Sequence, residues 1–446
     1  MLETIANIFK IPDLRNRILF TLALLSVYRL GIFIPAPGVN RAALSRFFNE
    51  NSNTLFSVYD MFTGGALEQF SVFVLGIMPY ITASIIMQVL KVAVPQWERL
   101  SKEGQSGQNK LTQYTRYMTI GIALVQSFAI STSLEQMKAG GVEDVVVDPG
   151  LSFKLMTMIT MTAGSCFVMW LGEQITERGV GNGASLIITA GIIARMPIAV
   201  MTLFQQVRLG DKNLLFLVLL GLFMFATIWG IVFFERGQRR IPIQYAKRVV
   251  GRRVYGGQNT FLPLKVNTAG VIPPIFASSV LMFPATLGTF YDSQIVAQLS
   301  AAFYPGEWLY NLTYVGMIVF FAYFYTAITF NPVDVADNLK KHGGYVPGIR
   351  PGRATADYID HLLTRLTAGG AVYLSVVCIL PTLLISEYNV PFYFGGTGLL
   401  IVVSVSLDTV AQVEAHLLTR HYDGVTHAKS GRARHRRALE QQRKKG

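Results

Sequence analysis

The chain has little charge and almost no cysteine. Only 15% of its 446 residues are Asp, Glu, Lys or Arg, whereas 51% are hydrophobic. Soluble domains carry about 25% charged residues, so this balance excludes an ordinary soluble protein and predicts a membrane protein. The two cysteines, Cys166 and Cys378, lie far apart in apolar runs. We interpret them as buried, inert thiols rather than as a disulfide or a metal-binding pair.

The sequence also lacks the patterns of an enzyme or an ion-coupled carrier. The six histidines have no HExxH or nucleophile motif beside them. The GVGNG run at 179–183 lacks the Lys-Ser/Thr end of a phosphate loop, so it predicts a tight turn between two antiparallel spans. The ionisable residues inside or near the ends of spans form no carboxylate cluster of the kind a carrier needs: Arg29, Arg195, Asp408 and Glu414. We expect structural pairing of these residues, and no enzymatic activity, cofactor or metal ion.

Ten apolar segments are long enough to cross a bilayer, whose hydrocarbon core needs about 20 helical residues. They lie near residues 18–34, 72–94, 117–134, 151–171, 184–204, 214–234, 268–290, 308–330, 366–385 and 398–418. An even number of spans places both termini on the same side of the membrane. The sequence therefore predicts an all-α polytopic membrane protein.

Lys and Arg are distributed unequally between the two sides of this bundle. With a cytoplasmic N-terminus, the inner segments hold 30 of the 39 Lys and Arg residues and the outer segments hold 5. Because cytoplasmic loops are enriched in Lys and Arg, both termini are predicted to be cytoplasmic. We also expect no cleavable signal peptide, since residues 1–17 have charges but no apolar core or small-residue cleavage site.

Two inner loops are longer and more basic than a connector needs. Residues 235–267 alternate apolar and basic residues around Gly256-Gly257, which predicts a β-hairpin or a looped basic finger. Residues 331–365 contain a short helical pattern ending at Lys340-Lys341, then a GIRPG turn that presents Arg350. Such loops could enforce orientation and meet anionic lipid, or dock a large acidic partner. Their length and the regularly placed glycine turns within them favour docking.

The stretch from Tyr59 to Val94 combines a short polar segment with a broken span. Residues 60–70 are too short and too polar to cross a bilayer, and Gly76 and Pro79 interrupt the span that follows. Isoleucines recur in several spans, at Ile77, Ile81, Ile85, Ile188, Ile192, Ile275 and Ile401. Ile275 follows Pro273-Pro274, and we expect these two prolines to break their span. A ring of them at mid-membrane would close a pore by dewetting, whereas ordinary helix packing would look similar in sequence.

Five motifs, in order along the chain, carry a resemblance to a known family. They are FTGGALEQFSVFVLGIMPYITASIIMQ, TERGVGNGASLII, RRIPIQYAKR, LPLKVNTAGVIPPIFASS and GIRPG. The chain resembles the SecY/Sec61-alpha family of protein-translocation channels over nearly its whole length. The resemblance implies ten transmembrane helices in two inverted, pseudo-symmetric five-helix halves, at 1–210 and 211–418, with a short plug helix. A basic cytoplasmic tail follows at 419–446, either solvated or in contact with nucleic acid or lipid.

The resemblance also implies four sets of site residues. The pore ring falls on Ile77, Ile81, Ile188, Ile192, Ile275 and Ile401. The lateral gate falls on Thr82, Gln88, Gln126, Ser278, Ser279 and Phe283. The surface that docks SecA and the ribosome falls on Arg239, Arg240, Lys247, Arg350 and Arg353. The plug falls on Asp60, Met61, Phe62, Thr63, Gly64, Gly65, Ala66, Leu67, Glu68, Gln69 and Phe70.

The implied function is that of a central translocase channel in the bacterial cytoplasmic membrane. It would pass unfolded polypeptides and release transmembrane segments sideways into lipid. Expected partners are SecE, SecG, the SecA motor ATPase, the ribosome, signal sequences, nascent polypeptides and anionic lipids, with no specific DNA. Arg195 and the doubled Pro273-Pro274 depart from the family pattern. The alternative is an inverted-repeat secondary transporter for a small solute, which would need ionisable residues converging near the midplane.

Overall fold

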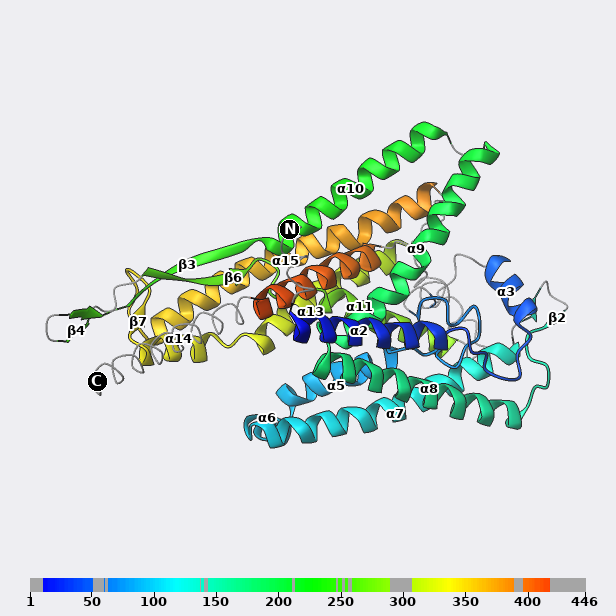
Figure 1. Ribbon diagram of the computed structural model, residues 1–446, viewed down its shortest axis with the longest axis horizontal. Helices are drawn as coiled ribbons and strands as arrows, with labels where there is room; N and C mark the ends of the chain where they lie inside the picture. The colour runs from blue at the N-terminus through cyan, green and yellow to red at the C-terminus, as the bar shows by residue number, and fades with distance from the viewer. Residues whose placement is uncertain are drawn as a thin grey trace, which may run out of the picture.

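Long helices make up most of the chain and run roughly along one axis, with a small β-sheet beyond one end of the bundle (Figure 1). The computed structural model describes residues 11–50, 60, 63–136, 138–139, 143–210, 213–245, 248–250, 253–255, 259–288, 307–388 and 396–417. The basic tail at 419–446 therefore lies outside the described residues.

The first part of the chain supplies the helices on one side of the bundle. In order these elements are α2 (Pro12–Gly31), α3 (Arg41–Glu50), α5 (Met78–Ala93), α6 (Pro95–Lys102), α7 (Gln105–Gln136), β1 (Lys138–Ala139), β2 (Glu143–Asp144), α8 (Leu151–Arg178) and α9 (Gly183–Leu209). Helix α7 packs against α5 and α8, and α2 packs against α8 and α9.

The second part adds further helices and the β-sheet. Its elements are α10 (Leu214–Arg236), β3 (Gln238–Tyr245), β4 (Arg248–Val250), β5 (Arg253–Tyr255), β6 (Asn259–Lys265), α11 (Ile272–Gly288), α13 (Trp308–Thr329), α14 (Pro332–Lys341), β7 (Gly344–Tyr345) and α15 (Arg353–Tyr388). A last helix spans Gly396–Leu417. Helix α13 packs against α11 and α15, and α11 contacts α5, so the two parts meet along that pair.

Each of the ten expected spans contains a helix, but only part of the count is confirmed. Among the described residues, seven helices are long and apolar enough to cross a membrane, or eight if the bent pair α5–α6 forms one span. The two helices of this pair are bent by 100°. Within α11 the apolar helix Ile272–Leu281 is shorter than a span, and the 20-residue α2 carries charge near both ends.

Two predicted helix breaks turn out to be helix starts. The chain runs through turns from Phe73 to Ile77, and α5 begins only at Met78 with Pro79 in its first turn. Gly76 precedes it with φ +53°, a conformation that glycine adopts without steric cost. The prediction that Pro273-Pro274 breaks a helix is wrong, because α11 begins at Ile272 and both prolines lie in its first turn. Proline is tolerated there because the first N–H groups of a helix have no intrahelical partner.

The GVGNG run forms the predicted turn between two spans. Helix α8 ends at Arg178 and α9 begins at Gly183, with the Asn182 side chain accepting a hydrogen bond from the Ser185 N–H at 3.2 Å. The turn brings the two helices so close that a Cβ on Gly183 would lie 1.9 Å from the carbonyl oxygen of Gly172. Cys378 is buried, as predicted, whereas Cys166 is only half-buried, and neither forms a disulfide among the described residues.

We expect Gly183→Ala to lower the thermal stability of the chain by about 1–3 kcal/mol, because the backbones of α8 and α9 must move apart to admit the methyl group. The measurement is the unfolding midpoint of the detergent-solubilised protein. Gly230→Ala on α10 is the matched control, since a Cβ there meets nothing within 4 Å. Equal midpoints for the two variants would contradict the close approach.

Candidate functional site

Isoleucines from both parts of the chain meet inside the bundle. The six residues predicted to form a ring share one apolar core: Ile77, Ile188, Ile192, Ile275 and Ile401 are at most 6% exposed, and Ile81 is half-buried against them. We call these six the aliphatic cluster. They come from α5 and the turn before it, α9, α11 and the last helix, so elements far apart in sequence contribute to one apolar core.

The predicted plug, residues 60–70, packs onto this core, and we call it the plug segment. Ala66 belongs to the same apolar cluster, and Asp60 and Phe70 are buried. Two side chains of α2 hold the segment from one side: the Tyr28 hydroxyl donates to the carbonyl oxygen of Thr63 at 3.1 Å, and Arg29 Nη1 donates to that of Gly64 at 2.7 Å. Met61 and Phe62 lie outside the described residues.

The plug is only partly helical. Asp60 and Thr63 have helical conformation, whereas residues 64–70 run through turns and a bend. Gly64 and Gly65 have φ of +71° and +95°, and Phe70 has φ +45°. Right-handed helix requires negative φ, so a helix over the whole of 60–70 is wrong.

The predicted gate residues lie on helices that meet or neighbour one another. Helices α5 and α11 are in contact. Thr82 on α5 donates to its own helix at the Met78 carbonyl, at 3.1 Å, and Ser278 and Ser279 on α11 both donate to the Ile275 carbonyl, at 2.9 and 2.8 Å. These three hydroxyls are therefore satisfied within their own helices.

The remaining gate residues are less well defined. Gln88 on α5 and Gln126 on α7 are half-buried, and the Gln126 Oε1 atom is buried without a hydrogen-bond partner among the described residues. The side chain of Phe283 lies outside the described residues. The structure thus brings Thr82, Ser278 and Ser279 onto contacting helices, and gives no cross-helix bond for either glutamine.

The two basic loops form a single unit. As predicted, the first loop contains a β-hairpin, in which β3 pairs antiparallel with β6 from Gln238↔Lys265 to Gln244↔Asn259. Strand β7 of the second loop adds to the other edge of β3, giving the order β6-β3-β7. The unit has a small core of its own: Ile241, Leu264, Val346, Ile359 and Leu363. It extends beyond the end of the helical bundle (Figure 1).

Arginines lie exposed on this unit. Arg239 and Arg240 are exposed on β3, next to the buried Ile241. Arg350 and Arg353 are also exposed, and Lys247 lies outside the described residues. The GIRPG turn is held from both sides, since Ile349 N–H donates to the Val346 carbonyl at 3.1 Å and Thr355 Oγ1 donates to the Arg350 carbonyl at 2.8 Å. The backbone of Arg350 is thus fixed while its side chain faces solvent.

Comparison with known proteins settles the family. The SecY family model matches residues 71–410. The protein translocase subunit SecY of Escherichia coli strain K12 is 48% identical over 415 residues, which is 92% of this chain and 93% of that protein. The chain belongs to the SecY family.

Solved structures agree on the SecY fold. A SecY channel, described as having a plug domain that stabilises the closed state and maintains a membrane seal, matches with a TM-score of 0.63 at 16% identity, over 90% of this chain and 91% of that one. Canine Sec61, in a ribosome–channel complex from the endoplasmic reticulum, matches with a TM-score of 0.58 at 16% identity, over the same shares. The chain is therefore a predominantly helical membrane protein with the SecY/Sec61 channel fold.

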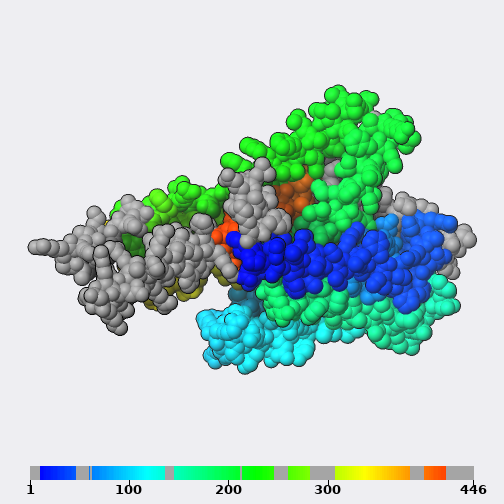
Figure 2. Space-filling view, viewed as in Figure 1, coloured from blue at the N-terminus to red at the C-terminus, as the bar shows by residue number. Residues whose placement is uncertain are grey.

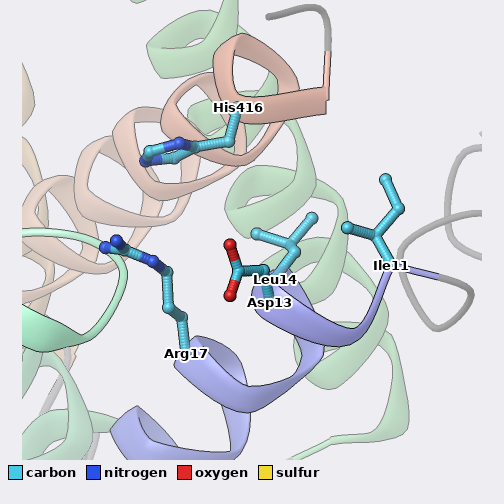
Figure 3. Close-up of a pocket in the computed structure, with 5 residues that line it drawn as sticks. All are labelled: Ile11, Asp13, Leu14, Arg17 and His416. Carbon is cyan, nitrogen blue, oxygen red and sulfur yellow. The ribbon is translucent and has the colours of Figure 1, made fainter. Parts of the chain in front are cut away.

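Two cavities of this SecY-family chain lie away from the aliphatic cluster. One, of about 70 Å³, is lined by Ile11, Asp13, Leu14, Arg17 and His416, with His416 of the last helix facing the start of α2 (Figure 3). This cavity has room for little more than a few water molecules, and it lies between the start of α2 and the end of the last helix. The other, of about 530 Å³, is mainly apolar and lies between α2, α9 and the last helix. Neither contains a residue of the predicted ring.

Sequence reasoning missed two features of the site. The first is that both basic loops share one sheet, which depends on the long-range pairing of Gln244 with Tyr345. The second is the role of Tyr28 and Arg29, which hold the plug from α2. A tyrosine and an arginine near the end of a span are usual at a membrane interface, so no sequence signal marked them as contacts of residues 35 positions away.

Proposed function

We propose that the chain is the channel-forming subunit of a protein translocase in the cytoplasmic membrane, with both termini cytoplasmic. It passes unfolded polypeptides across the membrane and releases transmembrane segments into lipid, and it performs no covalent chemistry itself. The observation that carries this proposal is the aliphatic cluster at the junction of the two parts of the chain, with the plug segment packed onto it. The proposed halves are 1–210 and 211–418, and the C-cap residue of α9, Gly210 with φ +85°, lies at this boundary.

The aliphatic cluster is the pore ring in this mechanism. A polypeptide crossing hydrocarbon would leave its backbone N–H and C=O groups unsatisfied, at several kcal/mol for each group. A ring of isoleucines excludes water when it is closed and spreads around a chain of any sequence when it is open, because its contacts are non-directional. The plug at 60–70 adds a second seal on the outer side.

The contact between α5 and α11 is the lateral gate. Thr82, Ser278 and Ser279 keep their hydrogen bonds inside their own helices. Parting the helices therefore breaks apolar packing but none of these three bonds, so opening costs less than it would with polar bonds across the seam. A signal sequence that binds the parted state better than the closed one shifts the equilibrium toward opening.

The unit built from β3, β6, β7, α14 and the start of α15 docks the partners that supply energy. Its exposed arginines Arg239, Arg240, Arg350 and Arg353 suit the phosphates of ribosomal RNA and an acidic face of the motor ATPase SecA. Energy then comes from ATP hydrolysis by SecA, chain elongation at the ribosome or the proton-motive force. SecE and SecG complete the assembly, and basic residues on the same side meet anionic lipid.

A small-solute carrier is not favoured by the ionisable residues. Arg195 of α9 is neutralised by two carboxylates of the plug, and Asp408 lies 3.5 Å from Lys265 with both side chains more than half exposed. Neither arrangement leaves a group poised to bind and release a coupling ion near the midplane, as carriers require.

A crosslinking scan tests the proposed pore. Single cysteines are placed at positions 77, 81, 188, 275 and 401 after replacement of Cys166 and Cys378, and each is tested against a cysteine in a stalled secretory precursor in vesicles. We expect all five to crosslink, whereas cysteines at the exposed Leu222 and Phe225 of α10 do not. Failure of all five with the precursor fully engaged would make the cluster ordinary packing and reopen the carrier hypothesis.

A further inference from the structure

A charged side chain of α9 fastens the plug segment to the channel wall. Arg195 Nη2 forms one ion pair with the Asp60 carboxylate and another, at 2.7 Å, with Glu68 Oε2. The Arg195 side chain is 11% exposed and that of Asp60 is 2% exposed, whereas Glu68 is more open at 36%. One guanidinium thus bridges the two acidic residues at opposite ends of the segment.

Asp60 also ties the segment together internally. Its Oδ2 atom meets Arg195, while Oδ1 accepts hydrogen bonds from the backbone N–H of Leu67 at 2.8 Å and of Glu68 at 3.0 Å. The same carboxylate therefore folds the segment and attaches it to α9. Its desolvation is offset only while both sets of partners stay in place, because a buried charge without partners is strongly unfavourable.

Two glycines allow the close approach that these contacts need. A Cβ on Gly65 would lie 2.8 Å from Arg195 Nη2, and a Cβ on Gly64 would lie 2.7 Å from the Cα atom of Gly191 on α9. Both glycines also have positive φ. Only glycine meets both conditions without strain, so the Gly64-Gly65 pair lets the backbone of the segment lie directly against α9 beneath the arginine.

We infer that Arg195 is a positioning residue that latches the plug closed and so sets how strong a signal sequence must be to open this channel. The inference rests on the proposed function, and goes beyond it by naming the residues that hold the seal. Displacing the plug separates both carboxylates from Arg195, and opening therefore carries an electrostatic cost in addition to lost apolar contacts.

The α2 contacts hold the same segment without ion pairs. Among the described residues, Tyr28 and Arg29 donate to the carbonyl oxygens of Thr63 and Gly64, and neither is in an ion pair with the segment. These bonds position the middle of the segment, whereas Arg195 is the group that meets its two carboxylates. Neutral side chains at position 195 should therefore weaken closure even with α2 intact.

The test measures resting ion conductance and plug exposure in vesicles that contain the full chain with its partner subunits. We expect Arg195→Ala to raise resting potassium conductance about tenfold, because removing the guanidinium leaves the buried Asp60 carboxylate without its ion-pair partner. Amide hydrogen exchange at 60–70 should accelerate in the same variant. Arg195→Lys should restore most of the seal. Arg208→Ala, which removes an exposed arginine in the last turn of α9, should match the parent.

A double-mutant cycle separates the latch from general loss of stability. Arg195→Gln and Asp60→Asn are measured singly and together. In a latch, the double variant leaks less than the sum of the single effects predicts, because no buried charge is left without its partner. A residue that only stabilises the fold would give additive effects and no rescue by lysine.

Comparing Arg195→Ala with a variant that lacks residues 60–70 distinguishes failure of the latch from failure of the plug assignment. If the deletion raises conductance but Arg195→Ala does not, the plug assignment holds and the latch is wrong. If the deletion leaves conductance unchanged, residues 60–70 are no seal and the proposed function loses its plug. The latch is supported if conductance rises in both the deletion variant and Arg195→Ala, and if the double-mutant cycle shows non-additive effects of the changes at positions 195 and 60.

Discussion

Arg350→Glu is expected to abolish translocation driven by SecA while the protein remains folded and inserted. The side chain is exposed in the turn between β7 and α15, and the Thr355 hydroxyl donates a hydrogen bond to the backbone carbonyl of Arg350. Reversing its charge opposite an acidic partner replaces attraction with repulsion, which costs several kcal/mol and lowers the rate by about 100-fold or more.

The measurement is the rate of precursor uptake into vesicles with purified SecA and ATP, alongside the affinity of SecA for those vesicles. Lys341→Glu is the matched control, since it makes the same charge change at an exposed residue of α14 in the same unit. We expect this control to lose less than about threefold, as is usual for a single exposed charge. Equal rates for Arg350→Glu and the parent would remove Arg350 from the docking surface.

How far the sequence predicts this molecule depends on the range of the interactions involved. Local patterns were sufficient for the helices, the β3–β6 hairpin and the turn between α8 and α9, because hydrophobic periodicity, basic alternation and glycine placement act over short distances. The starts of α5 and α11 were placed wrongly. In both cases a proline favours the first turn of a helix as readily as it breaks one.

The site required contacts that no local pattern specifies. The sequence marked Arg195 as unusual but could not pair it with Asp60, 135 positions away along the chain, because that contact exists only once α9 and the plug segment lie side by side. The choice of these six isoleucines followed from family resemblance rather than from periodicity. Ile85 and Ile318 are buried in the same core, and no sequence pattern separates them from the six. The space-filling view shows α2 lying across the face of the bundle that is turned toward the viewer (Figure 2).

Ile275→Asn is expected to make the resting channel leak and accept precursors with defective signal sequences. Ile275 is 6% exposed within the aliphatic cluster, and Ile401 and Ile188 of the same apolar core are 0% and 1% exposed. An amide in this ring binds water that isoleucine excludes, so the dry state loses about 1–3 kcal/mol relative to the wet one. That corresponds to a rise of about 5-fold to 140-fold in the wet population.

Two controls distinguish a broken seal from a damaged fold. Ile275→Leu keeps the apolar volume, and resting conductance should stay within about twofold of the parent because volume-conserving apolar substitutions are tolerated in packed cores. Ile231→Asn places the same amide at a fully buried residue of α10 that belongs to a different core, so it should lower stability without raising conductance per folded channel. If Ile231→Asn leaks as much as Ile275→Asn, the cluster has no special place in sealing. If only the Ile275 variant leaks, the barrier to ions lies where the two halves of the chain meet, and a passing polypeptide need only displace apolar side chains there.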